Sequence, residues 1–150
     1  MSGTPLKAAV DVRGPRFGAW VTSAVLAVAL LTASGWVVAA QAVVFAVGAF
    51  AGLRYAPYGV LFRRLVAPRL GPVREREPEA PPRFAQLVGL VFAVVGATGY
   101  LLGGPVVGAV ATGLALVAAL LNAATGFCLG CELYLTARRV MSSREPARTA

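Results

Sequence analysis

The chain has 150 residues, of which 58% are hydrophobic and only 13% are charged, and its formal net charge is +8. This balance is typical of a membrane protein and excludes an ordinary water-soluble domain. The charges form three clusters, separated by two stretches without any charged residue, 17–53 and 84–131. Because a spanning helix needs about 20 apolar residues, each stretch is long enough to cross a bilayer twice.

In the first apolar stretch, the sequence Ser-Gly-Trp at residues 34–36 interrupts the run. Glycine is a poor residue for a helix interior and tryptophan favours the headgroup level, so we expect membrane helices at 17–34 and 36–53. Residues 1–34 also fit a signal peptide, with a basic start and an apolar core. The next apolar run begins at once, without the polar segment that usually follows a cleavage site, so we favour a retained hairpin.

The loop between the two apolar stretches, residues 54–83, is strongly basic. Its first part, 55–70, mixes apolar and basic residues, which predicts a short helix on the membrane surface. The side chains expected to be buried there are Leu61, Phe62, Leu65 and Val66. In residues 71–82, three prolines predict a polar connector without regular helix. A lipid-facing loop is the simpler interpretation, and a platform for a protein partner is the alternative.

In the second apolar stretch, Gly-Gly-Pro at residues 103–105 predicts a turn and then a helix start, which gives helices at 84–102 and 105–126. A cysteine motif at 126–132 and a polar tail at 137–150 follow. The expected fold class is therefore all-α. It is a single integral membrane bundle of four transmembrane helices in two hairpins, with a basic interfacial segment between the second and third helices.

The lysine and all the arginines precede the first helix, lie in residues 54–83 or follow the fourth helix, and the two hairpin turns carry none. The positive-inside rule then predicts that both termini and the central loop are cytoplasmic. Nucleic-acid binding is the alternative interpretation of the basic charge. It is disfavoured because the arginines follow helix ends and no nucleic-acid module separates them. The expected partner of these charges is the lipid bilayer.

The only two cysteines, Cys128 and Cys131, stand three residues apart at the end of the last apolar run, and the chain has no histidine. If the fourth helix begins at Val106, Cys128 lies about 33 Å along its axis, slightly more than the hydrocarbon thickness. The pair is therefore expected at the cytoplasmic headgroup boundary, within reach of a soluble partner. Cysteines at this helical spacing have α-carbons close enough for a disulfide.

If Gly126 ends the fourth helix and another begins near Phe127, Cys128 faces free backbone N–H groups, which lower the pKa of a thiol. Cys128 is then the candidate nucleophile and Cys131 the resolving cysteine. Glu132 follows Cys128 by four residues and shares its helical face. Its carboxylate either exchanges the thiol proton or is simply a charge that ends a membrane helix.

Metal binding and simple packing are the rival roles for the cysteines. A structural zinc needs four ligands, and this chain offers two thiolates and no imidazole, so only a pair of protomers or help from Glu132 would complete the set. We therefore assign no metal and no cofactor. The long apolar stretches contain no Asp, Glu, Lys, Arg or His, which disfavours a proton-driven pump.

Three segments are similar to motifs of a known family: PRFAQLVG at 82–89, RRLVAP at 63–68 and TGFCLGC at 125–131. On these, the chain resembles an uncharacterised bacterial family of four-helix integral membrane proteins, classed as a domain of unknown function, over most of residues 7–140. The resemblance implies a bacterial inner-membrane protein with a cysteine pair on the cytoplasmic side. Because relatives are associated with thioredoxin-like and sulfurtransferase neighbours, it also implies a partner of that kind, but no established activity.

The sequence therefore leads to the hypothesis of thiol–disulfide exchange or sulfur transfer through Cys128 and Cys131 with such a partner. The alternatives are a non-enzymatic membrane component, which passes a small sulfur compound or scaffolds a complex, and a structural metal site shared between protomers. Whether the protein is an enzyme, and its oligomeric state, stay open at this point.

Overall fold

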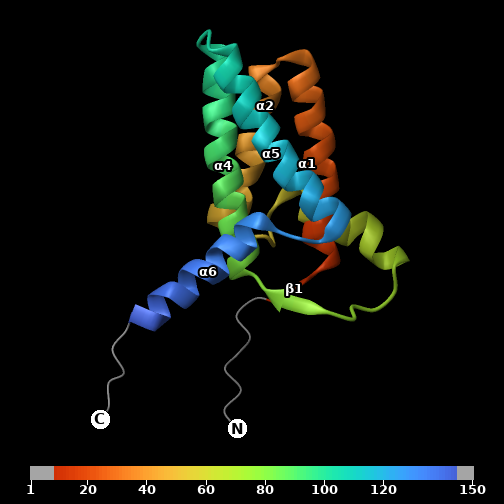
Figure 1. Ribbon diagram of the computed structural model, residues 1–150. Coiled ribbons are helices and arrows are strands. Elements are labelled where there is room, and N and C mark those ends of the chain that lie inside the picture. Colours follow the sequence, from red (N-terminus) through yellow and green to blue (C-terminus); the bar gives the residue numbers. More distant parts are fainter. Residues whose placement is uncertain (1–8, 145–150) are drawn as a thin grey trace.

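The computed structural model describes residues 9–144 and is mostly helical (Figure 1). In chain order its elements are β1 (Ala9–Asp11), α1 (Arg13–Thr32), α2 (Gly35–Ala46), the π-helical turn η1 (Val47–Ala51), α3 (Pro57–Leu61), the π-helical turn η2 (Phe62–Val66), the 3-10 turn η3 (Ala67–Arg69), β2 (Arg76–Pro78), α4 (Ala80–Leu101), α5 (Pro105–Thr125) and α6 (Leu129–Arg144). The predictions for the first eight residues and for the last six residues of the tail lie outside the described part.

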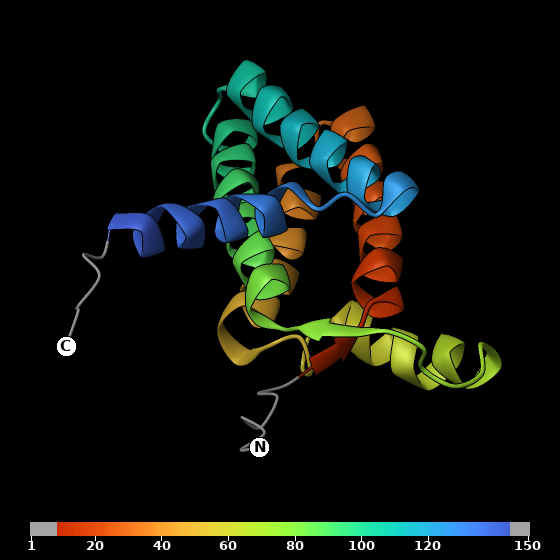
Figure 2. The same ribbon diagram turned by 60° about the horizontal axis from the view of Figure 1, so that its bottom comes forward.

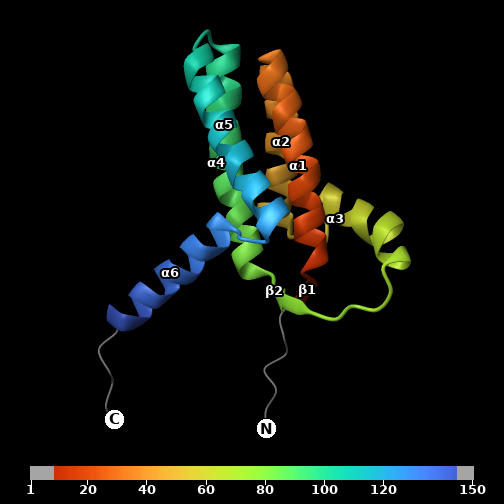
Figure 3. The same cartoon turned by 45° about the vertical axis from the view of Figure 1, so that its right-hand side comes forward.

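Among the described residues, three helices are long and apolar enough to cross a membrane, α1, α4 and α5. A shorter apolar helical run, Gly35–Ala51, is formed by α2 and η1. The prediction of a helical fold with helices long and apolar enough to span a membrane is confirmed at this level. The turns that join α1 to α2 and α4 to α5 lie at one end, and β1, β2, α3 and α6 lie at the other (Figures 1 and 3).

The long helices pack through small residues. Helix α4 contacts α2, α5 and α6, while α1 contacts α2 and α5. A Cβ atom added to Gly99 of α4 would lie only 2.5 Å from the backbone nitrogen of Gly108 in α5. In lipid the hydrophobic effect does not drive association between helices. Close approach of the backbones stabilises the helix pair instead, through van der Waals contacts. The central cluster of buried apolar residues is Ala29, Val38, Ala42, Phe45, Ala93 and Ala97.

The connector between the two helical pairs is more ordered than the sequence indicated. Residues 76–78 form β2, which pairs antiparallel with β1. Pro81 and Pro82 lie in the first turn of α4, where the backbone N–H groups have no helical partner and proline is tolerated. The expectation of an irregular connector through residue 82 was therefore wrong for its last part, and α4 starts at Ala80 rather than at residue 84.

The segment 57–69 is helical and contacts α1 and α2 of the bundle. Phe62 is buried, and its ring lies 5.7 Å from that of Phe17 in α1, centroid to centroid. Tyr58 donates a 2.6 Å hydrogen bond from its hydroxyl to Oε1 of the buried Gln41 in α2. Burial raises the pKa of the Tyr58 hydroxyl above its ordinary value. Leu61 and Leu65 are exposed and Val66 is partly buried, so the burial of these side chains in a membrane stays a prediction.

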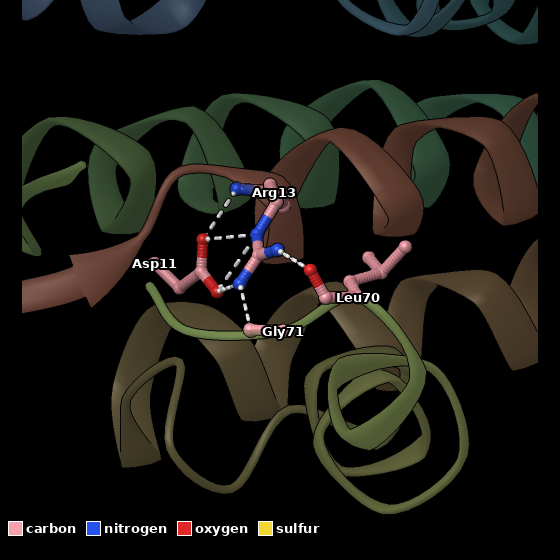
Figure 4. Close-up of polar contacts among 4 residues, drawn as sticks. All are labelled: Asp11, Arg13, Leu70 and Gly71. Carbon is pink, nitrogen blue, oxygen red and sulfur yellow. Dashed lines mark hydrogen bonds and ion pairs between the residues drawn. The ribbon is translucent and has the colours of Figure 1, made fainter. Parts of the chain in front are cut away.

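The ion pair between Asp11 and Arg13 joins β1, α1 and the central loop (Figure 4). Arg13 donates from Nε and Nη2 to the Asp11 carboxylate, and its backbone N–H donates to the same group. The guanidinium also donates to the carbonyl oxygens of Leu70 and Gly71. These bonds hold residues 70 and 71 of the central loop against the start of α1.

Replacing Gly99 by alanine should destabilise the fold, because the new methyl group meets the α5 backbone, which has no freedom to move aside. Overpacking of this kind costs about 1–3 kcal/mol. Gly113→Ala is the matched control, since a Cβ there meets nothing within 4 Å. Thermal unfolding in detergent should give a lower midpoint for Gly99→Ala and an unchanged or higher one for Gly113→Ala; equal midpoints would contradict the packing described.

The contribution of Asp11 should depend on pH. The hydrogen bond from the Arg13 side chain lowers the pKa of Asp11 below its ordinary value. Because the folded-state pKa lies below the unfolded one, the pair stabilises the fold above pH about 4, and this contribution is lost as the pH falls through the folded-state pKa. Wild type should therefore unfold at a higher temperature than Asp11→Asn at pH 6, and the difference should shrink toward pH 3. A difference that grows in acid would contradict this assignment.

Candidate functional site

A turn at residues 126–128 separates α5 from α6 and carries the cysteine motif. Gly126 ends α5 with a left-handed φ of +77°, which a residue with a side chain rarely adopts. Its N–H donates to the carbonyl of Asn122 at 2.9 Å. The N–H of Phe127 donates to Oγ1 of Thr125 at 3.2 Å. The chain thus leaves α5 in a hydrogen-bonded turn and starts a new helix at Leu129.

Cys128 and Cys131 are joined by a disulfide, with their α-carbons 5.2 Å apart. Cys131 lies in the first turn of α6, and Cys128 directly precedes that helix. The N–H of Cys131 donates to Sγ of Cys128 at 3.3 Å, and the N–H of Glu132 donates to the Cys128 carbonyl at 3.0 Å. Cys128 therefore caps α6, where the helix dipole and free N–H groups stabilise a thiolate after reduction.

Both cysteines are half-buried rather than sealed in the bundle. The residues around them are more open: Phe127 is 45% exposed and Leu129 is 41% exposed. Only Gly130, between the two cysteines, is fully buried within the motif. The disulfide thus lies at the surface of the bundle end, with apolar side chains beside it.

Helix α6 leaves the bundle at an angle and reaches beyond it (Figure 2). Its first turn is fixed on α4, because a Cβ atom added to Gly130 would lie 2.6 Å from Cα of Ala85. One turn later, the rings of Tyr134 and Phe84 pack 5.7 Å apart. The segment that the sequence places in a polar tail, from residue 137, is helical as far as Arg144.

A guanidinium from α1 caps the helix that precedes the cysteines. Arg16 donates from Nε to the carbonyl of Ala123 at 3.0 Å and from Nη2 to the carbonyl of Ala124 at 3.1 Å. The last carbonyls of a helix have no helical partner, and a positive charge there is favourable. The sequence interpreted Arg16 only as a charge that sets topology. No local pattern could have indicated this contact, which joins positions 107 residues apart.

Glu132 lies in the first turn of α6 and is exposed. Among residues 9–144, its carboxylate makes no hydrogen bond or ion pair with another side chain. The structure therefore brings Cys128, Cys131 and Glu132 into one turn, with Glu132 facing solvent. Its role in proton exchange stays a prediction. In the part of the chain that the structure describes, no group of three or more His, Cys, Asp or Glu residues gathers to hold a metal ion.

Taken together, the fold and the site define a helical protein of membrane type with a surface disulfide at the end of an apolar helix. The chain belongs to the family described as Domain of unknown function (DUF4395), whose profile matches residues 10–139. This confirms the resemblance to a domain-of-unknown-function family that the sequence motifs indicated. Comparisons with curated proteins and with solved structures found no match.

Replacing Gly130 by alanine should displace α6 from α4, because the added methyl group overlaps the α4 backbone at Ala85. Thr136→Ala, at an exposed position of α6, is the control. Trypsin cleavage after Arg138 and Arg139 measures how firmly α6 is held, since local opening exposes these bonds. We expect several-fold faster cleavage in Gly130→Ala and an unchanged rate in the control; equal rates would show that α6 does not depend on this contact.

Proposed function

We propose that this protein is a multi-pass protein of the bacterial inner membrane whose Cys128–Cys131 pair exchanges a disulfide, or a sulfur atom, with a cytoplasmic partner. The partner class is a thioredoxin-like protein or a sulfurtransferase. One observation carries the proposal: the two sulfurs are bonded to each other in a half-buried turn, with Cys128 capping α6.

A fourth membrane crossing by α2 and η1 is part of this proposal. The run Gly35–Ala51 has 17 residues, which extend about 26 Å, close to the hydrocarbon thickness. Its last carbonyls, of Ala49 and Phe50, accept hydrogen bonds from Arg83 of α4, which suits a helix end at the headgroup level. The end of the bundle that carries the arginines is assigned to the cytoplasm by the positive-inside rule.

The exchange step follows from the different surroundings of the two sulfurs. In the reduced protein, the N–H of Cys131 and the α6 dipole favour Cys128 as the thiolate. This thiolate attacks a disulfide of the partner, forms a mixed disulfide and releases a partner thiolate. Cys131 then loses its proton, with Glu132 as the nearest acidic acceptor in sequence, and attacks Sγ of Cys128. The disulfide of Cys128 and Cys131 forms, and the partner leaves with both electrons as a dithiol.

Sulfur transfer uses the same nucleophile. Cys128 thiolate attacks the outer sulfur of a partner persulfide, the S–S bond of the partner breaks, and the partner leaves as a thiolate. Cys128 then holds the sulfur atom as its own persulfide. Attack by Cys131 on the inner sulfur, Sγ of Cys128, would close the disulfide and release the carried atom as hydrosulfide.

Changing Cys131 to serine should trap the partner, because the mixed disulfide on Cys128 then lacks its resolving thiol. The matched control is Cys128→Ser, which removes the predicted nucleophile and should trap little. Adducts isolated from cells and identified by mass spectrometry after non-reducing electrophoresis give the readout. We expect about tenfold more adduct with Cys131→Ser than with Cys128→Ser.

Equal trapping by both variants would contradict the assignment of Cys128 as nucleophile. If neither variant forms an adduct, and partners co-purify equally with wild type and Cys128→Ser, the protein is a scaffold or a passage component rather than an exchange protein. A stoichiometric metal that bridges two reduced protomers would instead support the shared metal site.

A further inference from the structure

A second feature, separate from the cysteines, is an open hollow of about 540 Å³ between η1 and the start of α4. Its charged lining residues are Glu79 and Arg83, and its apolar ones include Phe50, Phe84 and Leu87. Its lining residues from 79 to 87 lie at the start of α4, and α4 begins at the same end of the bundle as β1 and β2 (Figure 3). In a membrane this end of α4 is at the headgroup boundary.

The two charges in the hollow are held in place but are not paired with each other. Glu79 accepts a 2.7 Å hydrogen bond from the Leu53 N–H at Oε1, and Arg83 donates from Nε and Nη2 to backbone carbonyls of η1. Among the described residues, the one ion pair within 4 Å joins Asp11 and Arg13. Within residues 9–144, Oε2 of Glu79 and Nη1 of Arg83 make no hydrogen bond, so both atoms can bond to a ligand.

Glu79, which directly precedes α4 with a helical backbone, is followed at intervals of four residues by Arg83 and Leu87, so the three lie on one face of this end of the helix. Each interval spans about 6 Å along the helix axis. From the end of the bundle toward its middle, this face offers a carboxylate, then a guanidinium, then an apolar side chain. Phe50, which is 69% exposed, adds an apolar wall on the η1 side.

We propose that this hollow binds one phospholipid with a primary ammonium headgroup, such as phosphatidylethanolamine. The ammonium group bonds to Glu79, the phosphate bonds to Arg83, and an acyl chain lies along Phe84 and Leu87. The order of charges on α4 matches the order of groups in such a lipid from water to hydrocarbon. A plain anionic lipid fits less well, because Glu79 repels it and the lipid offers no ammonium donor to Oε2 of Glu79.

The test uses protein purified in detergent and delipidated, titrated with phosphatidylethanolamine, phosphatidylglycerol or phosphatidylcholine of identical chains and followed by native mass spectrometry. Wild type should bind the ethanolamine lipid about tenfold more tightly than the other two, the difference expected from a charge-assisted hydrogen bond. Soluble phosphoethanolamine should not bind at the same concentrations, because it lacks the acyl chains.

Glu79→Gln should lower the preference for the ethanolamine lipid over phosphatidylglycerol to about one, while its amide oxygen still accepts from the Leu53 N–H. Glu75→Gln, at an exposed acid outside the hollow, is the control and should keep the preference. Equal affinity of wild type for all three lipids, a preference unchanged in Glu79→Gln, or equal binding of the soluble headgroup would overturn the proposal. Cys128→Ser should retain the lipid preference, so failure of the thiol chemistry would leave this result unaffected.

Discussion

The left-handed backbone of Gly126 determines where both sulfurs lie. With φ at +77°, this residue ends α5, and the turn that follows leaves Cys128 outside any helix and Cys131 in the first turn of the next one. Were α5 to continue unbroken, the N–H of Cys131 would belong to an α-helical ladder and would have no reason to face the sulfur of Cys128. The special chemistry of the pair therefore depends on one glycine and on the new helix start behind it.

Helix α4 is the scaffold that holds this turn in place. Its Ala85 contacts Gly130 of the motif on one side, and the neighbouring Phe84 packs against Tyr134 of α6 and also lines the hollow beside η1. One helical turn thus connects the disulfide to the lipid site proposed above. Since α4 also packs on α2 and α5, a shift of its first turn would displace residues of these helices as well.

The helical membrane-type fold could be predicted because apolar length and charge-free stretches follow directly from the bilayer thickness. A helix break near residue 34 was indicated by the sequence. In the structure α1 ends at Thr32 and α2 begins at Gly35, and the Ser34 side chain caps α2 by accepting from the N–H of Val37. The pairing of β1 with β2 and the hydrogen bonds from Arg16 to α5 join residues far apart in the sequence. No local sequence pattern could have predicted these contacts. A helix start near Phe127 was considered from Gly126, but the extension of α6 to Arg144 was not predicted, because its mixed composition resembles that of a polar tail.

The central claim is that Cys128 and Cys131 form a reversible redox pair that exchanges with soluble thiols. Alkylation after equilibration in graded thiol–disulfide buffers measures the midpoint potential of the pair in the purified protein. The account predicts a reversible two-electron transition between about −270 and −120 mV, the range of proteins that exchange disulfides. A pair that never exchanges with the buffer, or a midpoint below about −300 mV, would mark an inert structural crosslink and contradict the account.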